Sequence, residues 1–165
     1  MTWTFGSEVD LTNGGADDLR KVTLETGLSA SLMAIQVFVI EATSGADNST
    51  PILRLKGINW RMNFSDYTCK ATNTTSSDWR TTGFYSARED TIDASQAIVT
   101  TYKLYRWDRN EYLWFMNCHS HEVGSSIPRV SAGHIHLEGE LTDLQLVHSA
   151  GAALFTGGTA RVRYR

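Results

Sequence analysis

The fold is decided by Ala132-Gly-His-Ile-His-Leu-Glu-Gly-Glu-Leu-Thr-Asp-Leu-Gln-Leu-Val-His148, with the cassette Gly151-Ala-Ala-Leu-Phe-Thr-Gly-Gly-Thr159 and the closing run to Arg165. Apolar and polar residues alternate along these runs, and a period of two is typical of half-buried β-strands. Small and polar residues separate the runs. The stretch 132–165 therefore predicts three short strands joined by turns, the last turn being Phe155-Thr-Gly-Gly-Thr159.

The same alternation recurs along the rest of the chain, whereas helical periodicity is scarce. The predicted strands are Arg20–Glu25, Leu32–Glu41, Pro51–Lys56, Trp60–Phe64, Tyr67–Ala71, Ile98–Trp107, Glu111–Asn117, Ala132–Leu141, Asp143–His148 and Thr159–Arg165. Many short strands separated by turn residues are typical of two packed sheets. The predicted fold class is all-β, a jelly-roll-like antiparallel β-sandwich.

Three strands carry more specific predictions. Leu32–Glu41 is almost continuously apolar, which predicts a central strand covered on both faces. Ile98–Trp107 alternates, which predicts a half-exposed strand nearer an edge. Asp108-Arg-Asn110 joins it to Glu111–Asn117, and Asp and Asn suit the backbone of a three-residue loop, so a hairpin over Ile98–Asn117 is expected.

Length, composition and charge describe one folded domain over residues 1–165. The 165 residues are 41% hydrophobic and 20% charged, close to ordinary globular usage. A formal net charge of -3 without a block of basic residues predicts no nucleic-acid partner. The apolar run Leu32–Ile40 is too short for a membrane span and contains Gln36, and the opening Met-Thr-Trp-Thr is unlike a signal peptide. We therefore expect no membrane partner and synthesis in the cytoplasm.

The region Asn73–Ala94 is long and polar, which predicts a loop excursion of functional or interfacial use. Aromatic side chains supply stacking surfaces or interface anchors. Most of them lie in predicted strands, where packing explains them. Trp79 and Tyr85 lie in the excursion instead, so these two are predicted as ligand or interface contacts.

His134-Ile-His136 with Glu140 has the spacing of one half of a cupin metal site, because alternate strand residues point the same way and can share one ion. Cys118-His-Ser-His121 offers further ligands. The flanking glycines of that motif and its second half are missing, and the alternation with Ile135 equally predicts a solvated polar face. The polar face is the favoured interpretation, and no cofactor is expected.

A charged ladder is a second feature of this polar face. Arg161, Arg163 and Arg165 alternate with apolar residues in the last strand, and opposite charges on neighbouring strands would stabilise such a pairing. We also predict these three arginines as interface residues. The two cysteines, Cys69 and Cys118, are expected to be small packed thiols in a reducing compartment.

No catalytic constellation stands out. The acidic residues fall singly or in loops, and neither Gly-x-Ser-x-Gly, a phosphate-binding glycine loop nor Cys-x-x-Cys occurs. The sequence therefore predicts a protein that is not an enzyme.

The C-terminal run through His148, then Gly151, Phe155 and Gly158-Thr159, resembles small β-sandwich modules in structural proteins of tailed bacteriophages. Those modules commonly end in Leu-x-x-Ile-x-Leu, a small polar turn, Phe-x-x-Gly-[Ser/Thr] and a last strand. The resemblance implies a virion component: a capsid decoration or head-fibre protein, or a tail-fibre attachment module. It implies contacts with other virion proteins, a homo-oligomer, typically a trimer, and contacts with a host surface glycan.

Two other functions stay open from the residues. A carbohydrate-binding module would use Trp79 and Tyr85 for stacking on sugar rings. A cupin-like metalloenzyme would use His134, His136 and Glu140.

Overall fold

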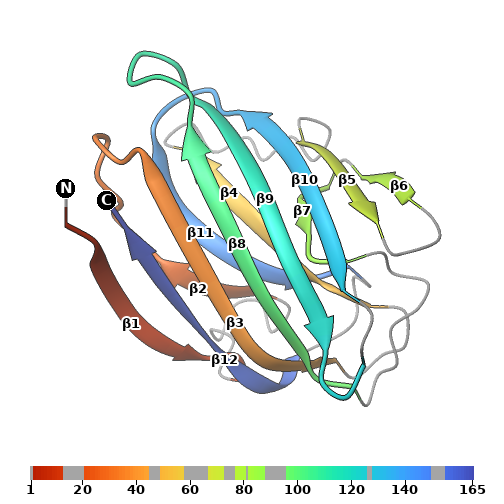
Figure 1. Cartoon of the computed structure of the whole chain (residues 1–165). Coiled ribbons are helices and arrows are strands. Elements are labelled where there is room, and N and C mark those ends of the chain that lie inside the picture. Colours follow the sequence, from red (N-terminus) through yellow and green to blue (C-terminus); the bar gives the residue numbers. More distant parts are fainter. Residues whose placement is uncertain are drawn as a thin grey trace.

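The computed structural model describes residues 2–12, 21–44, 49–57, 67–72, 77–80, 82–87, 96–125, 128–149 and 155–165, with backbone only at residues 21, 25, 72 and 77–80. It is an antiparallel sandwich of two sheets (Figure 1). The larger sheet has the order β1 (Thr4–Asp10), β12 (Phe155–Tyr164), β3 (Ala34–Ser44), β8 (Ile98–Arg106), β9 (Leu113–Glu122), β10 (Arg129–His136), β5 (Tyr67–Thr72) and β6 (Ser77–Arg80). The smaller sheet has the order β2 (Lys21–Glu25), β11 (Leu141–His148), β4 (Pro51–Gly57) and β7 (Phe84–Tyr85). The predicted all-β antiparallel sandwich is confirmed. No helix in the described ranges has the length and apolar character of a membrane span.

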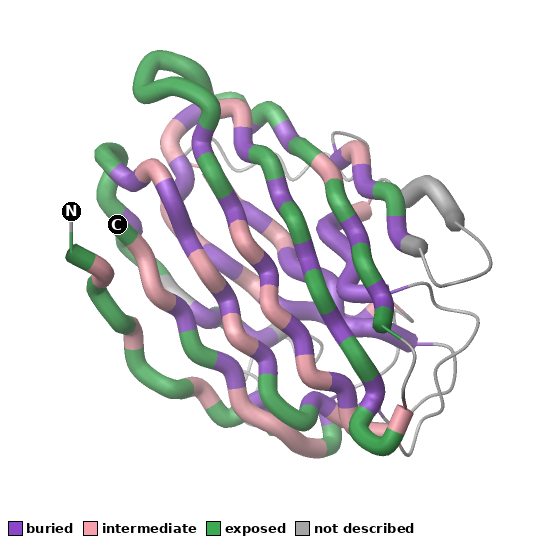
Figure 2. Tube along the Cα trace, viewed as in Figure 1, coloured by how far each residue is buried: buried purple, intermediate pink, exposed green. Residues whose placement is uncertain are grey.

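The hydrophobic core lies between the two sheets. Strand alternation turns one row of side chains from each strand inward, so buried and exposed residues alternate along the eight-stranded sheet (Figure 2). The largest inward side chains come from both sheets. They include Trp114, Tyr67, Tyr102, Ile35 and Met116 from the larger sheet, and Phe84, Leu53, Leu55 and Leu144 from the smaller one.

Two buried tyrosines also join the sheets by hydrogen bonds. Tyr102 on β8 donates its hydroxyl to the carbonyl of Pro51 at 2.8 Å. The Tyr67 hydroxyl on β5 accepts from the Leu55 N–H at 2.7 Å. Buried hydroxyl groups are costly unless they are paired, so these bonds fix where the small sheet sits on the large one.

Strands β3 and β8 correct two predictions. β3 is central, as predicted, but it is not covered on both faces, because Gln36 and Phe38 are half-buried and Ile40 is 48% exposed. β8 is half-exposed, as predicted, yet it lies between β3 and β9 rather than near an edge. Both strands are central in a sheet that is packed on one side only. Hydrophobicity along the sequence does not distinguish a strand covered on both faces from a central strand covered on one face.

The hairpin of β8 and β9 is confirmed, with Arg106 opposite Trp114 at its end. The buried Arg106 guanidinium donates to the carbonyls of Glu111, Ala30 and Arg109 at 2.8, 2.6 and 2.7 Å. The Asn110 N–H also bonds the Asp108 carboxylate at 2.8 Å. These contacts hold the loop that follows Trp107 in one conformation.

The segment Phe155-Thr-Gly-Gly-Thr159 is not a turn before the last strand; it is the beginning of β12. The pairing with β3 shifts register on both sides of Gly157, so the glycines form bulges inside a continuous strand. Gly158 has a φ of 101°, and a Cβ there would lie 2.7 Å from the Ala42 backbone. Glycine is required at this bulge by both conformation and space.

Other strand predictions differ in their bounds. β1 has no predicted counterpart, and Ala132–Leu141 is replaced by β10 followed by β11 from Leu141. The excursion Asn73–Ala94 contains two short strands, β6 and β7, so it is not one long loop. The predicted strand Trp60–Phe64 lies outside the described residues.

His148 is a buried histidine at the end of β11. Its Nδ1 shares a hydrogen bond with the Ser49 hydroxyl at 2.9 Å, and its ring lies 4.0 Å from the Phe155 ring, centroid to centroid. Burial disfavours the charged imidazolium and lowers the pKa of His148 from 6.5 to about 4.

We expect this histidine to make folding sensitive to acid. The unfolded chain takes up the proton first, so the contribution of neutral His148 is complete above about pH 6.5 and is lost as the pH falls toward about 4. Over that window the free energy of unfolding should fall by about 3 kcal/mol from this group alone. Urea unfolding at several pH values measures the slope. The variant His148→Gln should reduce the dependence of the free energy of unfolding on pH, and the control His134→Gln, at an exposed site, should leave that dependence unchanged. An unchanged pH dependence in His148→Gln would contradict the assignment of the acid sensitivity to His148.

Candidate functional site

Among the described residues, the exposed large hydrophobic side chains all belong to the eight-stranded sheet or to residues adjoining its strands. They are Phe5, Ile40, Tyr105, Trp107, Phe115, Val123 and Val130, with Trp107 the most exposed at 69%. The described part of the four-stranded sheet contributes none. A concentration of exposed apolar side chains on one surface of a soluble protein marks an interaction site. The outer face of the eight-stranded sheet is therefore the candidate site.

Strand β9 supplies the middle of this face. Its residues alternate strictly, so Trp114, Met116, Cys118, Ser120 and Glu122 are buried while the intervening side chains point outward. The outward row is Phe115, Asn117, His119 and His121. One strand thus presents a ring, an amide and two imidazoles in a line.

Three shallow hollows overlap along this row and form what we call the β9–β10 trough. The first, of about 370 Å³, lies by Phe115 and His134. The second, of about 330 Å³, shares Lys70, Asn117 and Ala132 with the first. The third, of about 430 Å³, shares His119 with the second and extends to His121 and Thr101. None of the described lining residues of the three hollows is acidic.

Small residues create the depth at one end of the trough. Ala132 and Gly133 on β10 form the floor between Phe115 and Lys70. β10 and β5 approach so closely there that a Cβ on Gly133 would lie 2.2 Å from the Thr68 carbonyl oxygen. Larger residues would fill the hollow or separate the strands.

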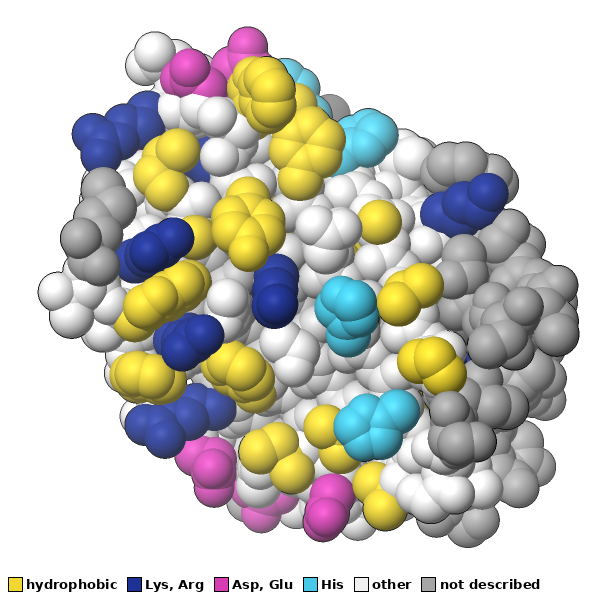
Figure 3. Space-filling view, viewed as in Figure 1, with side chains coloured by type: hydrophobic (Ala, Val, Ile, Leu, Met, Phe, Trp, Pro, Cys, Tyr) yellow, Lys and Arg dark blue, Asp and Glu magenta, His cyan; other side chains and the backbone are white. Residues whose placement is uncertain are grey.

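A second group of side chains, the Arg–aromatic strip, lies at the β1 side of the same face. The Arg163 guanidinium lies 4.7 Å from the Trp3 ring and 5.2 Å from the Phe38 ring. Arg161 lies 5.1 Å from Phe5, and Arg165 lies 4.7 Å from Trp3. Arg163 also donates from Nε to the Gln36 side-chain oxygen at 2.8 Å, and Arg161 donates from Nε to the Gly6 carbonyl at 3.3 Å. The strip therefore combines flat rings with cations that are held in place by hydrogen bonds. Figure 3 shows these alternating hydrophobic and basic side chains.

The electrostatics of the face are basic. The ion pairs formed within the described residues are Lys56–Asp143 and Glu122–Arg129, and neither involves the arginines of the strip. Glu8 lies opposite Arg161 in the β1–β12 register, so the charge is least balanced at Arg163 and Arg165. In Figure 3 the acidic side chains lie at the upper and lower margins of the view, and the histidines extend from its top through the middle into its lower half. This distribution favours an anionic partner.

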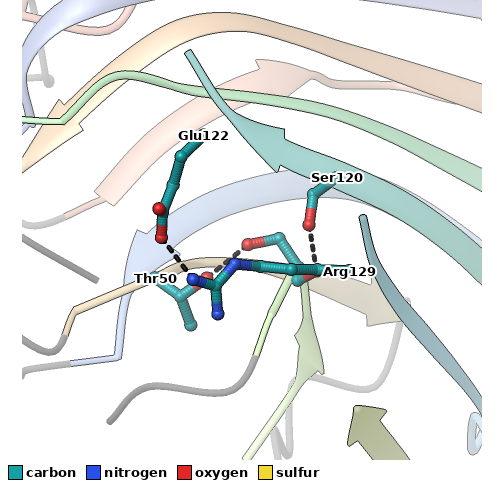
Figure 4. Close-up of polar contacts among 5 residues, drawn as sticks. Thr50, Ser120, Glu122 and Arg129 are labelled. Carbon is teal, nitrogen blue, oxygen red and sulfur yellow. Dashed lines mark hydrogen bonds and ion pairs between the residues drawn. The ribbon is translucent and has the colours of Figure 1, made fainter. Parts of the chain in front are cut away.

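A buried polar cluster supports one end of the trough (Figure 4). Arg129 Nη2 lies 2.5 Å from Glu122 Oε1, and both side chains are almost fully buried. Next to them the Ser120 hydroxyl donates to the Ser86 carbonyl at 2.6 Å, and the hydroxyls of Thr50 and Ser86 bond each other. Ser120 and Arg129 also line the third hollow, so this cluster fixes its wall.

The structure separates the residues predicted as sites. His134 and His136 are exposed and Ile135 is buried, so the predicted alternation is confirmed. The arginine ladder does not lie beside them, because β3, β8 and β9 separate β12 from β10. Within the described residues no three His, Cys, Asp or Glu side chains gather closely enough to hold a metal ion, so His134, His136 and Glu140 form no such set.

The structure tests one of the two predicted aromatic contacts, Tyr85, and does not describe the side chain of the other, Trp79. The prediction of Tyr85 as an exposed contact is wrong: the residue is 5% exposed and its hydroxyl bonds Thr82 at 2.7 Å. Trp79 pairs with Lys70 at the β5–β6 edge, and its side chain lies outside the described part of the structure. Cys69 and Cys118 are free and buried, and burial raises the pKa of the Cys118 thiol.

Sequence reasoning missed Trp107, Tyr105, Phe115, Asn117 and His119. The signal for β9 was present, because the alternation of Glu111–Asn117 continues through Cys118-His-Ser-His121 to Glu122. Extending the strand by that pattern would have placed the outward row on one face. Trp107 carried no such signal, since a tryptophan beside a hairpin loop is packed in some proteins and exposed in others.

No known protein family model matches the chain, and no curated protein matches it by sequence. Among solved structures, one similar chain is the crystal structure of the marine PL-14 alginate lyase from Aplysia kurodai. The two share 9% sequence identity and a TM-score of 0.44, over 87% of this chain and 80% of that one. At this level of similarity neither the fold nor the activity of that enzyme is transferred here.

Proposed function

We propose that this protein is a non-enzymatic structural and attachment protein of a tailed phage-like particle, acting through the outer face of its eight-stranded sheet. One observation carries the proposal: the exposed large apolar side chains gather on or beside one sheet and are absent from the described part of the other. Such one-sidedness suits a module that adheres to a neighbour while its second sheet closes the core.

The sequence resemblance is the reason for proposing a phage-like particle. The outer face of the eight-stranded sheet is the surface that we propose makes the contact. Flat sheet surfaces with aromatic anchors and arginines have the composition of protein interfaces. The rings of Trp107 and Phe115 pack edge to face, with their centroids 5.8 Å apart. Arg106 holds the loop after Trp107 by hydrogen bonds, so this pair of aromatic anchors is positioned before a partner binds. A preorganised anchor loses less side-chain entropy when a partner binds.

Immunogold electron microscopy tests the role. Antibody against the protein should label tailed particles purified from the lysate in which its gene is expressed. The label should mark one regular location, on the capsid or on the tail. Unlabelled particles, with all of the protein in the soluble fraction, would contradict the proposal.

A carbohydrate-binding role is the second candidate, and the exposed rings favour it. Its predicted contact Tyr85 is buried, so any sugar would have to stack on Tyr105, Trp107 or Phe115 instead.

A further inference from the structure

We infer that the β9–β10 trough and the neighbouring Arg–aromatic strip bind an acidic polysaccharide, one that carries carboxylates along its length. This inference rests on the proposed attachment function: the Trp107 end of the outer face contacts the particle, and the trough and the strip beyond it meet a ligand on the host surface. Three properties of the face favour this ligand: its charge, its hydrogen-bonding groups and its length.

The charge favours an anion. The described lining of the trough contains Lys70 and four outward positions held by Asn117, His119, His121 and His134, without a carboxylate. Lys103 adjoins Asn117 in the β8–β9 register and extends the basic surface toward the strip. Arg163 on β12 and Arg165, which directly follows that strand, are each stacked on Trp3. Complementary charge of this kind selects partners by sign.

The hydrogen-bonding groups favour a sugar polymer over a nucleic acid. Nucleic-acid sites depend on many Lys and Arg contacts with phosphates. Within the described lining of the trough the Lys and Arg side chains are Lys70 and Arg129, and Arg129 is buried against Glu122. The other cations of the face, Lys103 and the arginines of the strip, lie to one side of the trough and do not line it. The amide of Asn117, the hydroxyls of Thr68 and Thr101 and the imidazoles suit hydroxyl-rich ligands instead. Phe115 supplies an apolar ring face at one end.

The length favours a polymer over a single sugar. Phe115 and His121 are six residues apart on one antiparallel strand, which is ~20 Å of strand. The three overlapping hollows follow that line. They are open rather than enclosed, so a chain can lie along them without its ends being buried.

Biolayer interferometry with immobilised polygalacturonate tests the inference, with uncharged dextran and single-stranded oligothymidylate as comparison ligands. We expect binding to polygalacturonate and none to dextran. Asn117→Asp places a carboxylate in the trough and should weaken binding about tenfold. The matched control Thr23→Asp adds the same charge to an exposed position of β2, on the other sheet, and should stay within about twofold of the unmodified protein.

Thermal unfolding of both variants checks that they fold, and the exposed-site variant His119→Glu provides a second trough carboxylate if Asn117→Asp does not fold. Equal binding to dextran, tighter binding to oligothymidylate at the same ionic strength, or equal effects of Asn117→Asp and Thr23→Asp would each overturn the inference. Its failure is separate from failure of the virion role. Labelled particles without polygalacturonate binding reject only the ligand class, and polygalacturonate binding without labelled particles rejects only the virion role.

Discussion

Arg129→Met is expected to lower the free energy of unfolding by about 3–5 kcal/mol. Arg129 and Glu122 form an ion pair whose side chains are 4% and 8% exposed, beneath the His121 end of the trough. Removing the arginine leaves the Glu122 carboxylate buried without its counter-charge, and an uncompensated buried charge is far more costly than the pair itself was stabilising. Urea denaturation followed by tryptophan fluorescence measures the change.

The double variant Glu122→Leu, Arg129→Met is the control for this explanation. Replacing both partners by apolar side chains removes the unpaired charge, so most of the lost stability should return. The coupling between the two positions is then read from the two single variants and the double variant. A double variant as unstable as the sum of the singles would contradict the account, because it would assign the cost to packing volume instead.

Gly133→Ala is expected to lower the free energy of unfolding by about 2–3 kcal/mol, the cost of forcing an extra methyl group into a closely packed site. The new Cβ would lie 2.2 Å from the Thr68 carbonyl oxygen and 2.9 Å from the Cys69 Cα. Both are backbone atoms, so a side-chain rotation cannot relieve the clash, and β5 must move away from β10. That movement also displaces Lys70, which lines the trough from β5.

Ala132→Ser is the matched control for Gly133→Ala. It enlarges the preceding residue of the same strand, which is exposed on the outer face, and it should change stability by less than about 0.5 kcal/mol. Thermal unfolding monitored by circular dichroism compares the two variants. Equal melting temperatures would show that β5 accommodates the methyl group and would contradict the close-approach explanation.

The sequence was sufficient to predict the sandwich because most of its strands are amphipathic. Alternation around Ile135 and around Tyr102 identified β10 and β8, and the hairpin loop at Asp108–Asn110 was readable from turn chemistry. Strand β1 was not found: its burial pattern shows no buried side chain, and its place depends on pairing with β12 and on contacts such as Arg163 with Trp3. Those are tertiary contacts, which local periodicity does not contain.

The site was harder to predict than the fold because it depends on sheet order. Alternation in the sequence predicts that His134 points outward. Its neighbours depend on the pairing of β10 with β9 and β5, which places it beside Phe115 and Thr68 and which the sequence does not reveal. The expected arginine neighbours lie across three intervening strands. The prediction that Tyr85 is an exposed contact is wrong for a related reason. Strand β7 pairs with Ile52 and Leu53 of β4, and in that position the Tyr85 side chain is buried. A strand so short has no periodicity to read.

The most direct test of the central claim, that the outer face of the eight-stranded sheet makes the attachment, is the fraction of protein that sediments with purified tailed particles. We expect the double variant Trp107→Ser, Phe115→Ser to stay in the supernatant while its melting temperature remains within a few degrees of that of the unmodified protein, because both rings are exposed. The control Thr23→Asp, on the other sheet, should sediment like the unmodified protein. If the double variant sediments as fully as the unmodified protein, or if the unmodified protein does not sediment with particles, the account is contradicted.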